Sequence, residues 1–289
     1  MKRIAVISGK GGTGKTIITG ALATLAKGDL VFADCDVDAA NLELLFEPEI
    51  ETTEPYRGLQ VADIDQDLCI QCGNCEEYCR FGAIRYTDDR FFVDPVKCEG
   101  CAVCTLVCPT NATSMKDRES GKIFYSRTDR GPLAHARLEP GSGTTGLLVS
   151  EVKKRVNERA GDRDLLIADG PPGIGCPLIA TVTGMDAVLI VTEPSTSGLH
   201  DLKRVVKVAR NFGVDIFVAI NKYNLEESVA ARIEEYCEDE GIPVVGRIPF
   251  DPTVIEAIRS RKPVTEYDCP AADALRAMWE RIASALGRE

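Results

Sequence analysis

Short apolar runs alternate with longer amphipathic stretches in the first and last parts of the chain. Six runs have the length of buried strands: 2–8, 30–33, 165–168, 187–192, 216–220 and 244–248. Helical periodicity is clearest at 199–212, where Leu202, Val205, Val206 and Ala209 fall on one face. Strands that alternate with helices predict an α/β fold, a doubly wound parallel sheet with helices on both faces.

The middle of the chain breaks this alternation. Residues 48–58 show little periodicity, so we expect a connection that leaves the sheet. Small strands are expected at 59–64 and 84–93 around a cysteine-rich segment, and two short alternating segments, 123–126 and 133–138, should return the chain to the sheet. The last helix, expected at 271–286, carries Leu275, Met278, Trp279, Ile282 and Leu286 on one stripe, which predicts packing against the sheet.

Length and charge narrow the function. With 289 residues the chain allows one large domain or two smaller ones. A net charge of −11 argues against nucleic-acid binding, which favours a basic face. No apolar run is long enough to span a membrane, the last helix lacks a basic polar face, and the N-terminus resembles no signal peptide. We therefore expect a cytoplasmic protein without membrane association.

The stretch Gly9-Lys10-Gly11-Gly12-Thr13-Gly14-Lys15-Thr16 fits the phosphate-binding loop G-x-x-x-x-G-K-[ST]. A strand precedes it and a helix follows it, as this motif requires. We expect the phosphates of a nucleotide to be bound by the residues of the loop and helix start: Gly11, Gly12, Thr13, Gly14, Lys15, Thr16 and Ile17. Lys15 should reach the outer phosphates, and the Thr16 hydroxyl should bind Mg²⁺.

Acidic residues end two of the predicted strands. Asp34 and Asp36 follow the second strand, and Asp169 ends the apolar run 165–168 at the position of a Walker B aspartate. Carboxylates at this edge of a parallel sheet, beside a phosphate loop, suit a network of magnesium and water. A solvated acidic loop is the alternative for the residues after Asp34.

Lys10, directly after the first glycine, is not required by the general motif. With this lysine the loop resembles that of the deviant Walker A ATPases, the class of MinD, ParA, Mrp and the nitrogenase iron protein. The resemblance implies that Lys10 crosses a dimer interface to the partner's nucleotide in an ATP-dependent homodimer. It also implies that Asp36 positions the attacking water and that Asp34 contacts magnesium from the second shell.

Further positions match the same class. Asp169-Gly170-Pro171-Pro172-Gly173 looks like the switch II of Mrp-type ATPases. By resemblance, Asn221 reads the adenine edge, and the loop from Pro249 contacts the base, with Asp251 capping the next helix. Cys176 has an offset similar to that of a cluster ligand shared by two subunits in the nitrogenase iron protein, so it is a candidate dimer-bridging ligand; a plain buried thiol is the alternative.

Eight of the twelve cysteines lie between Cys69 and Cys108. They form two C-x2-C-x2-C-x3-C motifs, the spacing of a bacterial ferredoxin with two [4Fe–4S] clusters. In that arrangement the fourth cysteine of each motif binds the other cluster. The predicted ligand sets are Cys69, Cys72, Cys75 and Cys108 for one cluster, and Cys98, Cys101, Cys104 and Cys79 for the other.

Zinc is the competing interpretation, but zinc sites use paired C-x2-C units rather than these triplets. Arg80 follows Cys79 where ferredoxins usually have proline. Metal binding is favoured over disulfides because we expect a cytoplasmic protein.

The chain as a whole resembles MinD-superfamily ATPases with an inserted ferredoxin domain. We expect a discontinuous ATPase domain, 1–59 with 117–289, and a ferredoxin module at 60–116. Residues 60–115 contain nine Asp and Glu against four Lys and Arg, which suits a basic redox partner. The predicted function is ATP hydrolysis coupled to electron transfer. An Mrp-like iron–sulfur cluster carrier and a MinD-like positioning switch with structural clusters are the alternatives.

Overall fold

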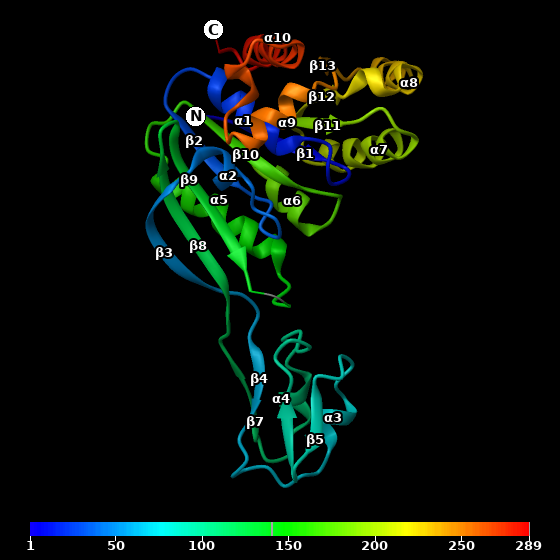
Figure 1. Cartoon of the computed structure of the whole chain (residues 1–289). Coiled ribbons are helices and arrows are strands. Elements are labelled where there is room, and N and C mark those ends of the chain that lie inside the picture. Colours follow the sequence, from blue (N-terminus) through cyan, green and yellow to red (C-terminus); the bar gives the residue numbers. More distant parts are fainter. Residues whose placement is uncertain (140, 289) are drawn as a thin grey trace. The chain divides into compact units, whose positions relative to one another are not determined.

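In the computed structural model, which describes residues 1–139 and 141–288, one large sheet organises most of the chain (Figure 1). Within these ranges the sheet has nine strands, in the order β13 (Val244–Ile248), β12 (Asp215–Asn221), β11 (Ala187–Thr192), β1 (Lys2–Ser8), β10 (Leu165–Pro172), β2 (Leu30–Asp34), β9 (Gly131–Leu138), β8 (Glu119–Thr128) and β3 (Glu49–Arg57). The pairs from β13 to β9 are parallel. The predicted α/β fold with a mainly parallel sheet is confirmed.

Helices cover both faces of this sheet. The helices of this part are α1 (Lys15–Leu25), α2 (Leu42–Phe46), α5 (Thr145–Arg159), α6 (Cys176–Val182), α7 (Thr196–Arg210), α8 (Glu227–Asp239), α9 (Pro252–Arg259) and α10 (Pro270–Ala285), with single 3-10 turns at η1 (Tyr223–Leu225) and η2 (Val264–Glu266). On one face, α1 and α10 pack on alternate residues of the central strands. On the other face, α5, α6 and α7 contact β2, β10, β11 and β1.

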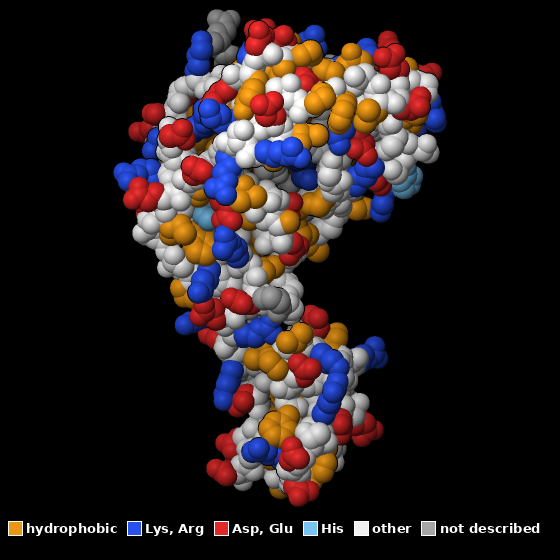
Figure 2. All heavy atoms as spheres, viewed as in Figure 1, with side chains coloured by type: hydrophobic (Ala, Val, Ile, Leu, Met, Phe, Trp, Pro, Cys, Tyr) orange, Lys and Arg blue, Asp and Glu red, His pale blue; other side chains and the backbone are white. Residues whose placement is uncertain are grey.

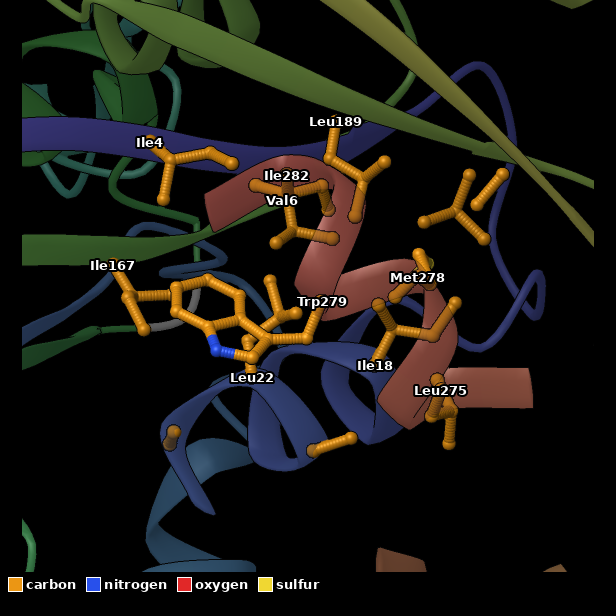
Figure 3. Close-up of a cluster of buried hydrophobic side chains, with 14 of the residues drawn as sticks. Ile4, Val6, Ile18, Leu22, Ile167, Leu189, Leu275, Met278, Trp279 and Ile282 are labelled. Atoms are coloured by element: carbon orange, nitrogen blue, oxygen red, sulfur yellow. The ribbon is translucent and has the colours of Figure 1, made fainter. Parts of the chain in front are cut away.

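The core beneath α10 explains its sequence stripe. Leu275, Met278, Trp279 and Ile282 are buried against Ile18 and Leu22 of α1 and against Ile4, Val6, Ile167 and Leu189 of the sheet (Figure 3). The prediction that the last helix packs against the sheet is confirmed. No described helix has the length and apolarity needed to cross a bilayer.

The connection expected at 48–58 is a strand rather than an irregular segment. The nine-residue strand β3 lies at the end of the sheet order. Only Tyr56 in this strand is buried, because an edge strand here faces solvent on both sides. The strand is held by backbone hydrogen bonds and buries neither face, so its sequence shows no apolar periodicity.

Contacts divide the chain into two compact units. The first comprises Met1–Thr53, Ile123–Ala136 and the residues from Thr145 onward; the second comprises Glu54–Lys122 with the described part of Arg137–Thr144. The predicted module, 60–116, lies inside the second unit. That unit contains β4 (Val61–Ile64), α3 (Asn74–Glu77), β5 (Ile84–Thr87), β6 (Arg90–Val93), α4 (Val103–Val107) and β7 (Thr113–Lys116). Here β4 pairs with β7 and β5 with β6, both antiparallel.

The second unit is built from two similar halves. Each cysteine of the second motif follows its counterpart by 29 residues, as Cys98 follows Cys69. Backbone conformation repeats at the same offset, because three pairs share left-handed φ values: Gln71 (58°) with Gly100 (66°), Gly73 (83°) with Ala102 (60°), and Gly82 (57°) with Asn111 (55°). Residues other than glycine rarely adopt this conformation. Its presence at Gln71, Ala102 and Asn111, each opposite a glycine of the other half, indicates that the two loops have the same backbone fold.

Candidate functional site

The phosphate loop connects β1 to α1. Gly12 and Gly14 have φ values of 77° and 91°, a region that L-residues rarely adopt. At Gly14 a Cβ atom would also lie 2.4 Å from the Asn221 side-chain nitrogen. The Lys15 side chain is buried at the start of α1. The Thr13 hydroxyl is buried without a hydrogen-bond partner, so the loop holds a polar atom that a ligand can satisfy.

Two threonines of α1 hold Asp169, the predicted Walker B aspartate. The Thr16 hydroxyl donates to Oδ2 of Asp169 (2.7 Å), and the Thr19 hydroxyl lies 2.8 Å from Oδ1. Asp169 therefore contacts the predicted magnesium residue Thr16 directly. Sequence reasoning missed Thr19, although it lies one turn after Thr16 and so faces the same side of the helix.

Asp34 anchors the loop that follows β2. Its buried carboxylate accepts backbone N–H groups of Asp36 (3.1 Å), Asn41 (3.0 Å) and Leu42 (3.1 Å). These contacts fix the start and the end of the loop that carries Asp36. Asp34 therefore has a positioning role that the sequence did not reveal, in addition to its predicted place near magnesium.

The electrostatics of this edge favour a bound cation. Asp34 and Asp169 are register partners on adjacent strands and both are buried. Burial, and then the charge of Asp169, raise the pKa of Asp34 well above its ordinary value. Burial also raises the pKa of Asp169 to about 6, although Thr16, Thr19 and Lys15 oppose that shift. A divalent cation at this edge would relieve the repulsion between the two carboxylates.

Asp36 lies beside the loop as well. Burial raises the pKa of its carboxyl, the charge of Lys15 lowers it, and Asp38 raises it again. Asp36 therefore shares its electrostatic surroundings with Lys15, the residue predicted to reach the outer phosphates. The structure thus brings together Lys15, Thr16, Asp34, Asp36 and Asp169. Mg²⁺ is usually bound through one or two carboxylates, waters and substrate phosphates, which is the donor set offered here.

Lys10 is engaged within its own chain. Its Nζ lies 2.5 Å from Glu193 Oε1 and also contacts the hydroxyls of Ser195 (3.5 Å) and Ser197 (3.3 Å). Lys222 approaches the other oxygen of Glu193 at 3.7 Å. Glu193 therefore lies between two lysines and holds Lys10 beside the N-terminus of α7, a role that the sequence did not indicate.

The predicted base-binding residues have partners of their own. The Asn221 side-chain nitrogen donates to the Thr13 carbonyl (2.8 Å), and its oxygen accepts from the Lys222 backbone (3.0 Å). Asn221 thus supports the phosphate loop directly. Asp251 caps α9 through the Thr253 N–H, as predicted, and also accepts from the Ala271 N–H at the start of α10. Pro249 directly follows β13, in the short segment before α9.

Cys176 is the first residue of α6, directly after the predicted switch loop, and it is exposed. It packs against α5, because a Cβ atom at Gly146 would lie 3.0 Å from the Cys176 Cβ. Its proposed role as a bridging ligand stays a prediction.

The eight clustered cysteines line two small cavities in the second unit. One, here the Cys69 cavity, is lined by Cys69, Cys72, Cys75 and Cys108. The other, here the Cys98 cavity, is lined by Cys79, Cys98, Cys101 and Cys104. In each, three cysteines come from one motif and the fourth from the other, which is the grouping that the spacing predicts.

Backbone donors point at three of these sulfurs. The N–H groups of Ala62, Ala83 and Ala112 approach the Sγ atoms of Cys98 (3.4 Å), Cys79 (3.4 Å) and Cys108 (3.2 Å), respectively. Burial raises the pKa of Cys108, but hydrogen bonds from its neighbours outweigh that effect and lower it to about 7. Such donors stabilise thiolate, the form of cysteine that binds metal.

Within 1–139 and 141–288, no three His, Cys, Asp or Glu side chains converge as a site for one metal ion. The ligands of a single ion must meet at one point, about 2.3 Å away for zinc and sulfur. The cysteines of a four-iron cluster each bind a different iron, so they surround a volume instead. Each cavity offers four thiols, which is the donor set that a four-iron cluster takes.

Comparisons with known proteins agree with this fold. Residues 4–264 match CbiA, the CobQ/CobB/MinD/ParA nucleotide binding domain. An uncharacterized protein of Methanocaldococcus jannaschii is 32% identical over 97% of this chain and 96% of its own length. The iron-sulfur cluster carrier protein of Pyrococcus horikoshii is 25% identical over 98% of this chain and 86% of its own.

Among solved structures, the cell division ATPase MinD of Pyrococcus furiosus has a TM-score of 0.59 at 19% identity, covering 98% of this chain and 99% of that one. MinD of Pyrococcus horikoshii in complex with Mg-ADP has the same TM-score and identity, covering 99% and 97%. At this identity the likeness shows the fold alone, a MinD-like α/β P-loop fold.

Proposed function

Because the chain belongs to the CobQ/CobB/MinD/ParA nucleotide-binding family, we propose that it is an ATPase whose nucleotide cycle is coupled to electron transfer through two [4Fe–4S] clusters. The observation that carries the proposal is the joint presence of a phosphate loop joined to its Walker B aspartate and two cavities with four cysteines each.

In the ATPase part, the loop from Gly11 to Thr16 binds the phosphates, and Ile17 continues the contact at the start of α1. Lys15 neutralises the outer phosphates, while Thr16 and Asp169 hold Mg²⁺. Asp36 orients the attacking water from the loop that Asp34 fixes. Lys10 leaves Glu193 and reaches the nucleotide of a second copy, so ATP closes a homodimer.

In the second unit, the two cysteine sets hold the clusters, with Cys69, Cys72, Cys75 and Cys108 on one and Cys79, Cys98, Cys101 and Cys104 on the other. The clusters supply one-electron transfer. The chain itself supplies thiolates, N–H groups that stabilise them, and a small apolar core that covers them: Ala62, Ile64, Ile84 and Phe91. Such a shell sets the solvent access and the potential of a cluster.

A physical route for coupling runs through α6 and α5. The predicted switch loop ends at α6, and the Lys153 ammonium of α5 donates to carbonyls at the end of α6, those of Ala180 (2.7 Å), Thr181 (2.8 Å) and Thr183. A rearrangement of the switch loop that moves α6 therefore also moves α5. α5 begins at Thr145, directly after the last residue of the second unit, so the two units are joined covalently at this point.

The test is an anaerobic count of iron and sulfide with EPR, followed by cluster oxidation with and without MgATP. About eight irons per chain are expected, and MgATP should shift the cluster potential or the rate of electron delivery. Zinc, or no metal, at Cys69–Cys108 would contradict the cluster assignment. Eight irons with identical behaviour in both nucleotide states would refute the coupling while leaving both sites assigned.

A second candidate is an iron–sulfur cluster carrier, favoured by the relative of that name in Pyrococcus horikoshii. The Cys-Pro-x-Cys motif of Mrp-type carriers is absent from this chain. A carrier would transfer iron to an apo-ferredoxin within minutes and lose it to a chelator. Retention of all eight irons under both conditions would exclude this function.

A further inference from the structure

The two cysteine cavities occupy different ends of the ribbon formed by β4 and β7. The Cys98 cavity is lined by Ala62 and Met115, and the Cys69 cavity by Ile64 and Thr113, two residues farther along each strand. The chain enters and leaves the ribbon at the Ala62 end, where the Gln60 side chain donates to Asp117 (2.9 Å). Within this unit, the Cys98 cavity is therefore beside the chain connections and the Cys69 cavity is at the far end.

The connections contact the loop of the Cys98 cavity at Gly100, although Cys101 beside it is exposed. A Cβ atom at Gly100 would lie 2.5 Å from the Gln60 carbonyl oxygen, so the backbone there is in close contact. The Arg118 guanidinium donates to the carbonyl of Pro95, three residues before Cys98, and to that of Gly141. The equivalent of Gly100 in the other half is Gln71, which has a full side chain at nearly the same φ, so its Cβ occupies the space that the Gln60 carbonyl approaches beside Gly100.

Exposed apolar side chains surround the loop of the Cys69 cavity. Ile70 is 63% exposed and lines the Cys69 cavity, Leu68 is 52% exposed, and Cys72 is exposed as well. The Gln71 side chain fastens this loop to the β5–β6 hairpin, because it donates to the Asp89 carbonyl (2.8 Å) and accepts from the Tyr86 hydroxyl (3.3 Å). We call Leu68, Ile70, Gln71, Cys72 and Tyr86 the Ile70 surface.

Negative charge borders this surface. The exposed acids nearest in sequence to its loops are Asp65, Asp67, Glu76, Glu77, Asp88 and Asp89. The exposed cations of the hairpin are Arg85 and Arg90, and the Arg90 guanidinium stacks on the Phe92 ring at 4.5 Å. The position equivalent to Ile70 in the other half is Glu99, so the residue after the first cysteine of the motif is apolar at the far end and acidic at the other. Figure 2 shows apolar, acidic and basic side chains together on the visible face of this unit.

We propose that the Ile70 surface is the docking site for a small protein electron carrier that presents basic side chains around an apolar contact. This rests on the proposed function, because it needs a cluster in the Cys69 cavity. One electron crosses the surface, so the donor is oxidised by one electron and the acceptor is reduced by one. Apolar contact shortens the path to Cys72, and the charges steer the encounter.

The test uses anaerobic holoprotein reduced with dithionite, freed of excess reductant, and mixed with oxidised mitochondrial cytochrome c, a basic haem protein. Two matched pairs separate the ends of the unit. Asp67→Lys and Glu99→Lys make the same charge change beside the first cysteine of each motif. Ile70→Ser and Phe81→Ser each remove an exposed apolar side chain that lines a cysteine cavity. Each rate is divided by the cluster content measured by EPR.

We expect Asp67→Lys to lower the second-order rate constant roughly tenfold at low ionic strength and by less than about twofold at 0.5 M salt. Ile70→Ser should lower it at both salt concentrations, and Glu99→Lys and Phe81→Ser should change it by less than about twofold. Equal losses in both members of a pair, or none, would overturn the docking site. Absence of iron from the wild-type protein would instead be a failure of the proposed function.

Discussion

Releasing Lys10 from its own chain should strengthen ATP-dependent dimerisation. The Lys10 ammonium lies 2.5 Å from Glu193, with the two side chains 31% and 23% exposed. A lysine that reaches the nucleotide of a second copy must first break this ion pair. Glu193→Gln removes the charge and keeps the shape, so it lowers the free-energy cost of that departure. The substituted residue lies outside the phosphate loop, and nucleotide binding by one chain should persist.

The size of the effect follows from the partial burial of the pair. A fully exposed pair contributes about 0.2–1 kcal/mol, and a hydrogen bond to a charged group about 1.5–3 kcal/mol. Glu193 keeps Lys222 as a second cation at 3.7 Å, which reduces the cost when Lys10 leaves. We therefore take about 1 kcal/mol for each lysine. A symmetric dimer releases two lysines, so about 2 kcal/mol, or roughly a 30-fold lower dimer dissociation constant, is expected.

Sedimentation equilibrium with a non-hydrolysable ATP analogue measures this constant. Glu240→Gln is a matched control, because it breaks the Arg210–Glu240 ion pair, also 2.5 Å long, far along the chain from the loop. In a Lys10→Ala background, Glu193→Gln should have no further effect, as a double-mutant cycle requires. An unchanged or weaker dimer in the single variant would refute the view that Glu193 restrains Lys10.

Four further outcomes are expected. Asp36→Asn should slow phosphate release at least about 100-fold while calorimetry finds ATP affinity within about threefold. Thr19→Val removes a hydroxyl beside Asp169, so Mg²⁺-dependent ATP affinity should fall about 10- to 100-fold, with Mg²⁺-free affinity unchanged in the same titration. The double variant Cys79→Ser, Cys98→Ser loses two ligands of one cavity, so iron analysis should find about four irons per chain. The double variant Cys75→Ser, Cys79→Ser loses one ligand of each cavity and should keep no iron. Gly100→Ala should lower the unfolding free energy by roughly 1–3 kcal/mol more than Gly73→Ala in chemical denaturation, because both have left-handed φ but only Gly100 meets the Gln60 carbonyl.

The sequence predicts the central sheet well because its strands are buried on both faces. The predicted limits of β1, β11 and β13 agree with the structure, and those of α10 differ by one residue at each end. Such strands read as continuous apolar runs. Edge strand β3 and the short strand β7 carry no such signal, since their stability comes from backbone pairing and from neighbours distant in sequence.

The predicted site residues near the phosphate loop share one edge of the sheet, because their motifs end the parallel strands β1, β2, β10 and β12 or follow them. The sequence does not predict which side chains of different motifs contact one another. Nothing in the local sequence of Glu193 indicates that it holds Lys10, and nothing near Asn221 indicates that it donates to the Thr13 carbonyl. These pairs depend on strand order, which places β11 and β12 beside β1.

The second unit shows what a repeated motif leaves undetermined. The two cysteine motifs have the same spacing, so spacing alone gives both cavities the same chemistry and the same access. The structure distinguishes them, because Gly100 is in contact with the incoming chain whereas Gln71 is free to carry a side chain that fastens its loop to Tyr86 and Asp89. A glycine is required where the Gln60 carbonyl approaches the loop, and a larger residue is tolerated at the equivalent position of the other loop. Glycine at position 100 and glutamine at position 71 therefore mark which cavity lies near the chain connections. This difference can be interpreted only once the fold is known.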